Sequence, residues 1–171
     1  MATDFNPTID IWIKELDSYD FEQLLIKPAN EHWSLGQVYI HIIEATHYFI
    51  KQVNICATTD ENAGEEAFPV AQAMFLQDDF PDRRLDGPPS NAKTKQPESK
   101  EQILKGLLGL KEEVASAESL MATANHKGKT RQFGLNYFSA QQWFQFAEMH
   151  MRHHLRQKKR IDEFLNHHSN I

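Results

Sequence analysis

The sequence predicts an all-α protein, an antiparallel up-down four-helix bundle with a long loop between its second and third helices. Four stretches carry apolar residues at helical spacing, and no stretch alternates convincingly between apolar and polar residues as a strand would. With 171 residues the chain has the length of one domain, so we expect residues 1–171 to form a single bundle.

The first two helices are bounded by local signals. The first runs from about Pro7, a residue suited to the first turn of a helix, to Ile26. The second begins at Ser34, which forms a capping box with Gln37, and continues to about Ala57. The residues that we expect on its inner face are Val38, His41, Ala45, Tyr48, Gln52, Ile55 and Cys56.

The third and fourth helices are also bounded by local sequence signals. The third is predicted over Glu98–Ala124, directly after a proline, with a mainly leucine-based apolar face. The fourth opens on a second capping box, Ser139 with Gln142, and extends to about His167.

Two connections remain. Some forty residues, Thr58–Pro97, separate the second helix from the third, far more than an ordinary helix connection. Within them Glu65–Leu76 could form a short helix, and the proline-rich Phe80–Pro97 is expected to be extended. Such a loop is either a functional lid or a disordered linker, and the sequence leaves both open. The glycine-containing segment Asn125–Phe138 is interpreted as a second loop.

Composition excludes several classes of protein. A net charge of −6 opposes general affinity for nucleic acid, and a late basic cluster is explained as a solvated helix face: Arg152, Arg156, Lys158, Lys159 and Arg160. No apolar run approaches the roughly 20 residues of a membrane helix, and no secretory signal is evident, so we expect a cytoplasmic protein without membrane contact. The single cysteine, Cys56, is interpreted as a small buried apolar residue.

The fourth helix carries the most informative pattern. At about 100° per residue, one face collects Trp143, Ala147, His150, His154, Gln157, Ile161 and Phe164. His150 and His154 are four residues apart, so they project from adjacent turns and can share one metal ion. In the second helix His41 takes the equivalent inward position.

Three inward imidazoles allow two explanations. Each could find its own hydrogen-bond partner in the core, or one divalent cation could satisfy all three and keep a coordination position open. His153 lies about 60° from the inner face and could replace His154, but His154 is closer to its centre. The remaining histidines are interpreted as surface or loop residues: His32, His47, His126, His167 and His168.

Glu44 and His47 have the ExxH spacing of di-iron carboxylate bundles. That site needs a second such pair and two further glutamates, and the fourth helix offers none in register. A ferritin-like site is therefore rejected.

Three segments together resemble the DinB/YfiT-like superfamily of metal-dependent four-helix bundles. They are WSLGQVYIH at residues 33–41, HMRHHLRQ at residues 150–157, and the lead-in QFGLNYFSAQQW at residues 132–143, which is similar to an uncharacterised branch. The resemblance implies a metal, zinc or nickel, held by His41, His150 and His154. Glu44, Gln52 and Gln157 are candidates for orienting the imidazoles.

The resemblance also sets the expected function. It implies a metal-dependent enzyme, a thiol-dependent transferase or a hydrolase, acting on a small molecule with a low-molecular-weight thiol as a candidate partner. The alternative is a non-catalytic bundle that binds a metal or another ligand, for example as a stress-related homodimer. No catalytic base can be named from the sequence, and the Phe80–Pro97 loop is where specificity could depart from characterised members.

Overall fold

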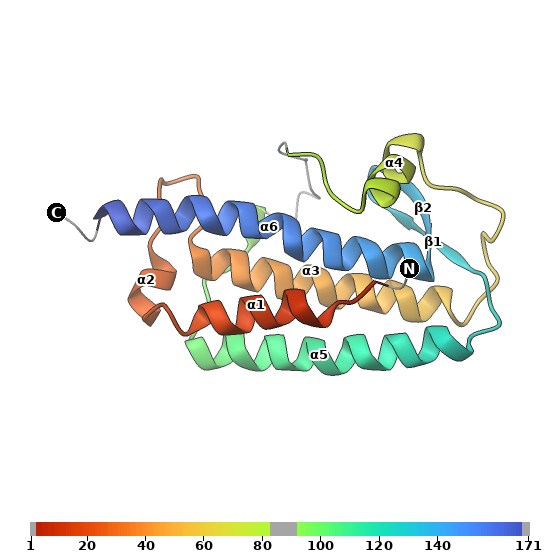
Figure 1. The fold of residues 1–171 in the computed structure, drawn as a ribbon, viewed down its shortest axis with the longest axis horizontal. Helices are drawn as coiled ribbons and strands as arrows, with labels where there is room; N and C mark the ends of the chain where they lie inside the picture. Colours follow the sequence, from red (N-terminus) through yellow and green to blue (C-terminus); the bar gives the residue numbers. More distant parts are fainter. Residues whose placement is uncertain (1–2, 83–91, 169–171) are drawn as a thin grey trace.

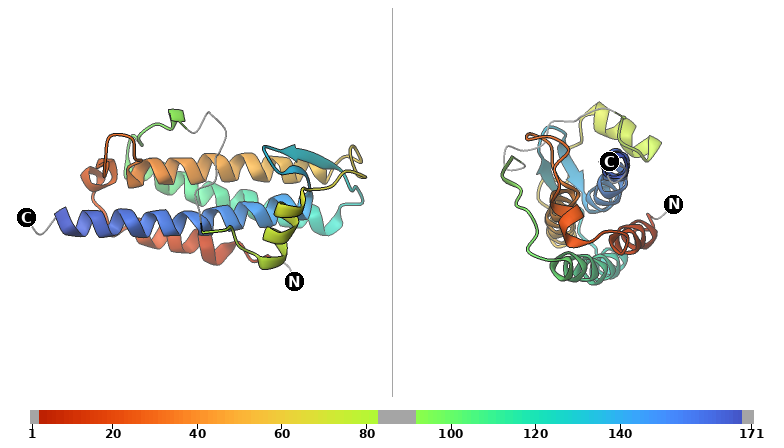
Figure 2. Two further views of the ribbon diagram at one scale, coloured as in Figure 1. Left: turned by 90° about the horizontal axis from the view of Figure 1, so that it is seen from above. Right: turned by 90° about the vertical axis from the view of Figure 1, so that its left-hand side faces the viewer.

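The computed structural model describes residues 3–82 and 92–168, and these residues are mostly helical. The helices of 11, 22, 24 and 29 residues lie side by side along the molecule (Figures 1 and 2). The elements in chain order are α1 (Asn6–Leu16), α2 (Phe21–Leu25), α3 (Leu35–Cys56), α4 (Pro69–Gln77), α5 (Lys100–Thr123), β1 (Lys129–Gln132), β2 (Asn136–Ser139) and α6 (Ala140–His168).

The order of helix directions differs from the predicted up-down bundle. In Figure 1, α3 and α5 both start at the end of the bundle that carries α2, whereas α1 and α6 run the opposite way. The connection of residues 57–99 therefore has to return the chain along the length of the bundle before α5 begins. A loop long enough to do this allows two consecutive helices to be parallel, which the helical periodicity of the sequence cannot reveal.

Both predicted capping boxes are confirmed. The backbone N–H of Gln37 donates to Ser34 Oγ at 3.1 Å, and that of Gln142 donates to Ser139 Oγ at 3.2 Å. The predicted first helix, however, is broken in two. Asp20 caps α2 and forms a capping box with Gln23, so the chain turns between α1 and α2 rather than continuing to Ile26.

The segment Asn125–Phe138 was predicted to be a loop, but it contains the antiparallel hairpin of β1 and β2. Its strands have four residues each, too few to show alternation in the sequence. The turn uses a glycine, Gly134, with φ of +82°. The hairpin packs beside Cys56, whose buried thiol lies 3.6 Å from Thr130 Oγ1, and burial raises the pKa of this thiol. Cys56 is thus buried as expected.

The predicted loop between α3 and α5 is confirmed only in part. A short helix does form there, but α4 covers Pro69–Gln77 and starts later than the predicted Glu65. Much of the stretch expected to be extended, residues 83–91, lies outside the described residues.

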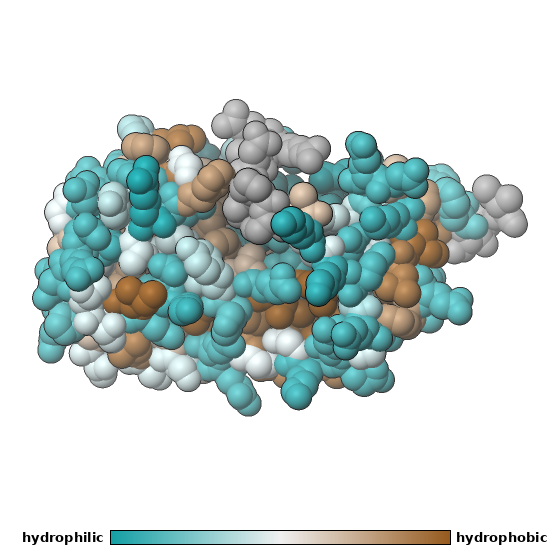
Figure 3. Space-filling model, turned by 180° about the vertical axis from the view of Figure 1, so that it is seen from behind, coloured by the Kyte–Doolittle hydropathy of each residue, from teal (hydrophilic) through white to brown (hydrophobic). Residues whose placement is uncertain are grey.

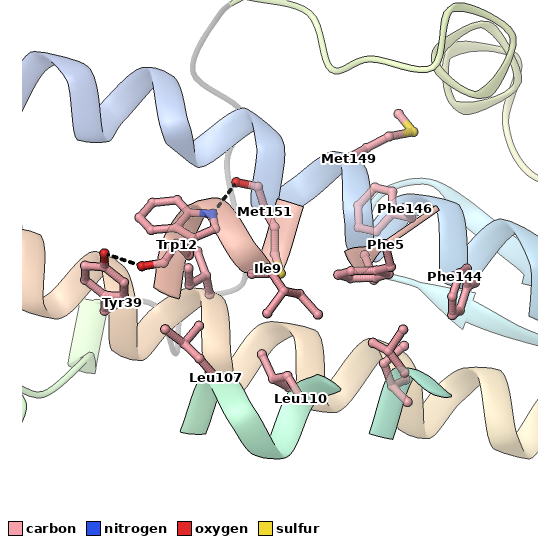
Figure 4. Packing of buried hydrophobic residues seen from close by; sticks show 14 of the residues in the cluster. Phe5, Ile9, Trp12, Tyr39, Leu107, Leu110, Phe144, Phe146, Met149 and Met151 are labelled. Carbon is pink, nitrogen blue, oxygen red and sulfur yellow. Dashed lines mark hydrogen bonds between the residues drawn. The ribbon is translucent and has the colours of Figure 1, made fainter. Parts of the chain in front are cut away.

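The core fills the space between the four long helices, and Figure 4 shows part of it. The indole of Trp12 donates to the backbone oxygen of Met151 at 3.2 Å, and the Tyr39 hydroxyl donates to the backbone oxygen of Trp12 at 2.8 Å. The predicted inner face of the second helix is partly wrong, because Tyr48 and Ile55 are 49% and 39% exposed. The buried residues of α3 after His41 are instead Ile42, Thr46, Ile50, Val53 and Cys56, of which only Cys56 was predicted.

Charged residues also lie inside, which the basic-cluster interpretation missed. Lys158 is 5% exposed and pairs with Glu15 at 3.0 Å and with Asp162 at 2.7 Å. Glu148 is 6% exposed and accepts from Thr8 and from the guanidinium of Arg152. These partners offset the cost of burying charge and join α6 to α1.

The outer surface is mixed. Figure 3 shows hydrophilic side chains over much of one face, with apolar side chains in separate patches between them. Over the described parts of the chain, every helix is too short or too polar to cross a lipid bilayer.

Candidate metal centre

The middle of the bundle brings the three predicted histidines together. His41 lies on the second turn of α3, and His150 and His154 lie on adjacent turns of α6. α3 and α6 pack along their length, so the imidazoles meet across the interface between the two helices. One nitrogen from each ring lies within 4.8 Å of the other two, and His41, His150 and His154 are the one such group of ligand side chains found in residues 3–82 and 92–168.

The distances fit a shared ion. His150 Nε2 lies 3.2 Å from His41 Nε2 and 3.2 Å from His154 Nε2. For zinc–nitrogen bonds of about 2.1 Å in a tetrahedral arrangement, two ligand nitrogens should be about 3.4 Å apart. Two of the three nitrogen pairs are therefore close to the separation expected of ligands that share one metal ion, and the group as a whole lies within 4.8 Å.

His41 is buried and His150 and His154 are partly buried, and desolvation keeps all three imidazoles neutral. Desolvation, with a smaller contribution from His154, lowers the pKa of His41 to about 3. Desolvation also lowers the pKa of His154 to about 4, and it holds the pKa of His150 well below its usual range. Neutral imidazoles offer the lone pairs that metal ligation requires, so the ligand state is prepared at neutral pH.

Gln157 orients one of the ligands. Its Oε1 lies 2.9 Å from His154 Nδ1, so Nδ1 donates and the lone pair of the neutral ring is on Nε2, toward the other two rings. The predicted supporting role of Gln157 agrees with this contact. Glu44 is exposed and Gln52 is half-buried, and within the described residues neither bonds to the three imidazoles.

The two ring nitrogens of His150 differ in their surroundings. Its Nδ1 is buried and has no hydrogen-bond partner among the described residues, while its Nε2 faces two other imidazoles. Buried polar atoms are usually paired. A single cation on the Nε2 side would replace the crowded contacts between the ring nitrogens.

Aromatic rings surround the three imidazoles. Trp33 packs on His41 with ring centroids 4.8 Å apart. Phe49 and Phe80 pack on His150 with centroids at 5.3 and 6.1 Å. These rings exclude water, which explains the low pKa values. Trp33 and Phe80 belong to loops, where helical periodicity gives no signal, so the sequence alone did not identify them as part of the centre.

The other histidines lie elsewhere. His153 accepts at Nδ1 from Arg156 at 3.0 Å and does not join the group, as expected from its position off the inner face. His47 pairs with Glu113 at 2.9 Å, and His126 pairs with Asp60 at 3.1 Å, both on the surface. The exposed surface positions predicted for the others are also confirmed: His32, His167 and His168.

The match to known families agrees with this geometry. The family model of the DinB superfamily matches residues 8–157, which include α3, α5 and most of α1 and α6 with all three histidines. The chain belongs to the DinB superfamily. Searches of curated proteins and of solved structures gave no match. The DinB assignment therefore rests on the family model, and what this DinB chain does has to be argued from its own site.

Proposed function

We propose that this DinB-superfamily protein binds one divalent metal ion, zinc or nickel, through His41, His150 and His154. We propose further that the loaded centre works as a metal-dependent enzyme, a thiol-dependent transferase or a hydrolase acting on a small molecule. The observation that carries the proposal is the number of ligands: three converging imidazoles, with no fourth histidine, cysteine or carboxylate joined to them among the residues described. Structural zinc sites have four protein ligands, whereas catalytic sites have three and keep one position for water or substrate.

The residues of the chain have defined parts in this proposal. His41, His150 and His154 supply neutral nitrogens, and Gln157 fixes the tautomer of His154. Trp33 and Phe80 limit water around the centre. A divalent ion held there would lower the pKa of a bound water or thiol and polarise a substrate carbonyl.

A second candidate, from a different class, is a non-catalytic metal- or ligand-binding bundle, for example a stress-related homodimer. It is favoured by the ring packing over the imidazoles and by the location of two surface clefts. One cleft of about 430 Å³ lies between the hairpin and α4, and another of about 550 Å³ lies between α3 and α5. None of the three histidines lines either cleft.

The first experiment measures metal content. The purified protein is analysed for zinc, nickel, iron and copper, then stripped and titrated with zinc and with nickel. We expect one ion per wild-type chain and less than a tenth of that in His41→Ala, with His153→Ala as the matched control that retains it. A wild-type chain that takes up none of these ions at neutral pH contradicts the metal centre.

The second experiment separates the two candidates. The loaded protein and its stripped form are compared in a screen of low-molecular-weight thiols with electrophilic acceptors and with ester or amide substrates. Turnover that requires the metal supports an enzyme. Full loading without turnover, together with a concentration-dependent dimer in sedimentation experiments, supports the non-catalytic bundle.

A further inference from the structure

The chain that follows α4 forms one wall of the centre. Phe80 is 5% exposed, and its ring packs on Phe146, His153 and His150 with centroids at 5.0, 5.2 and 6.1 Å. Figure 1 shows α4 beside the first half of α6, and the chain after α4 turns toward that helix. Phe80 therefore lies between the surface and His150.

A turn at the end of α4 directs Phe80 toward α6. Asp78 adopts the left-handed conformation with φ of 52°, which aspartate tolerates better than most residues. The backbone N–H of Asp79 donates back to the Met74 oxygen at 3.3 Å. This helix end reverses the chain, so that Asp79 and Phe80 meet side chains of α6.

One guanidinium on α6 holds both residues. Arg156 donates to Asp79 Oδ2 at 2.6 Å, to the backbone oxygen of Phe80 at 3.2 Å and to His153 Nδ1 at 3.0 Å. The fixed fork of a guanidinium can serve several acceptors at once, which an ammonium group does with less geometric control. Arg156 thus ties the wall to the helix that carries His150 and His154.

A second set of contacts anchors α4 itself but not Phe80. Arg152 pairs with Asp78 at 3.4 Å, and Gln145 donates to Asp78 Oδ1 at 2.8 Å and to the Phe75 oxygen at 3.0 Å. Arg152 also pairs with Asp79, at the longer distance of 3.8 Å. Within residues 3–82 and 92–168, Arg156 is the side chain that bonds to both Asp79 and Phe80. Loss of Arg156 should therefore release Phe80 and the shorter ion pair of Asp79 while α4 stays docked.

We propose that Arg156 is a positioning residue, a latch that holds the Asp79–Phe80 segment over His150 and so sets access to the centre. The inference rests on the proposed function, because that function supplies the metal ion and the substrate whose access the latch would limit. Arg156 and Asp79 are 31% and 41% exposed, so water can replace their contact and the latch can open reversibly. The latch itself is a property of the protein and can be tested on protein that contains no metal.

The test uses diethyl pyrocarbonate, which modifies neutral and accessible imidazoles, on the stripped full-length protein, with each histidine followed by peptide mass spectrometry. We expect Arg156→Gln and Asp79→Asn each to raise the modification rate of His150 at least fivefold. His47, which is 64% exposed, serves as the internal reference and should react at an unchanged rate. Lys159→Gln is the matched control, since it removes an exposed cation of α6 and should leave the His150 rate as in wild type.

Two comparisons exclude a purely structural effect. Val114→Ala weakens the core at α5 and should leave the His150 rate within twofold of wild type. The double variant Arg156→Gln with Asp79→Asn should react no faster than the faster single variant, because both single substitutions break the same Arg156–Asp79 contact. An unchanged His150 rate in both single variants, or an equal rise in Val114→Ala, overturns the latch.

A second measurement connects the latch to the metal. In zinc-loaded protein, Arg156→Gln should speed zinc loss to excess chelator at least fivefold while the bound stoichiometry stays at that of wild type. If wild-type protein binds no zinc or nickel, the proposed function fails, and the modification rates still decide whether the latch exists. If zinc binds but dissociates from Arg156→Gln at the same rate as from wild-type protein, the latch does not control access. This inference then fails while the proposed function stands.

Discussion

The three neutral imidazoles make the metal-free protein sensitive to acid. In the folded chain the pKa of His41 is lowered to about 3 and that of His154 to about 4, and that of His150 is also far below its usual range. In the unfolded chain each imidazole has a pKa of about 6.5. The unfolded state therefore binds more protons, so the stability present above pH 6.5 is lost as the pH falls toward the folded values. At pH 5.0 the loss is about 2 kcal/mol each for His41 and His154, or about 4 kcal/mol for the pair, and His150 adds to it in the same direction.

Urea denaturation followed by tryptophan fluorescence measures this loss directly. We expect the free energy of unfolding in excess chelator to fall by about 4 kcal/mol or more between pH 7.5 and pH 5.0, a large share of the stability of a typical domain. His41→Gln should reduce the fall by about 2 kcal/mol, whereas His32→Gln, at an exposed position, is the control that should not. A fall below 1 kcal/mol in wild type, or one that His41→Gln leaves unchanged, refutes the buried neutral triad.

The remaining predictions concern the ligands and one close contact. His154→Ala should abolish most zinc binding in a titration and His153→Ala should not; the reverse result would show that the helical register is wrong. Gln157→Leu should weaken zinc binding by about 10–100-fold in competition with a chelator, because it frees the ring of His154. Chelation should lower the melting temperature of loaded protein by roughly 10 °C at pH 7.5 and much less at pH 5.5, since protons compete for the ligands; equal effects contradict histidine ligation. Gly36→Ala should cost about 1–3 kcal/mol in urea denaturation, because a Cβ there would meet the Leu24 oxygen at 2.7 Å and the Pro97 ring at 2.8 Å.

Local signals in the sequence predicted local structure well. The boxes at Ser34 and Ser139 fixed the starts of two helices because a cap depends only on residues within one turn. The same chemistry occurs at Asp20, where the capping box that starts α2 breaks the helix predicted over Pro7–Ile26. The parallel course of α3 and α5 could not be predicted, since it depends on where a long connection ends rather than on any local pattern.

The position of the histidines was predictable for a similar reason. A spacing of four residues on one helix puts His150 and His154 on one face whatever the rest of the fold does. The wall around them was not predictable, because Trp33 and Phe80 come from loops whose course is set by tertiary contacts. The face of α3 was also rotated from its expected orientation, which left Tyr48 outside while His41 stayed inside.

The placement of the imidazoles indicates whether the protein needs a metal ion in order to fold. The core near the histidines contains two aromatic pairs, Trp12 with Tyr39 at 5.0 Å between centroids and Trp143 with Phe49 at 5.6 Å. Both pairs belong to a hydrophobic core that is held together by apolar contact and needs no ion. The histidines are thus a small polar group within a core that apolar residues already fill. A protein built this way should stay folded when its metal is removed, which separates it from a zinc finger and agrees with a centre whose ligands are kept ready for chemistry.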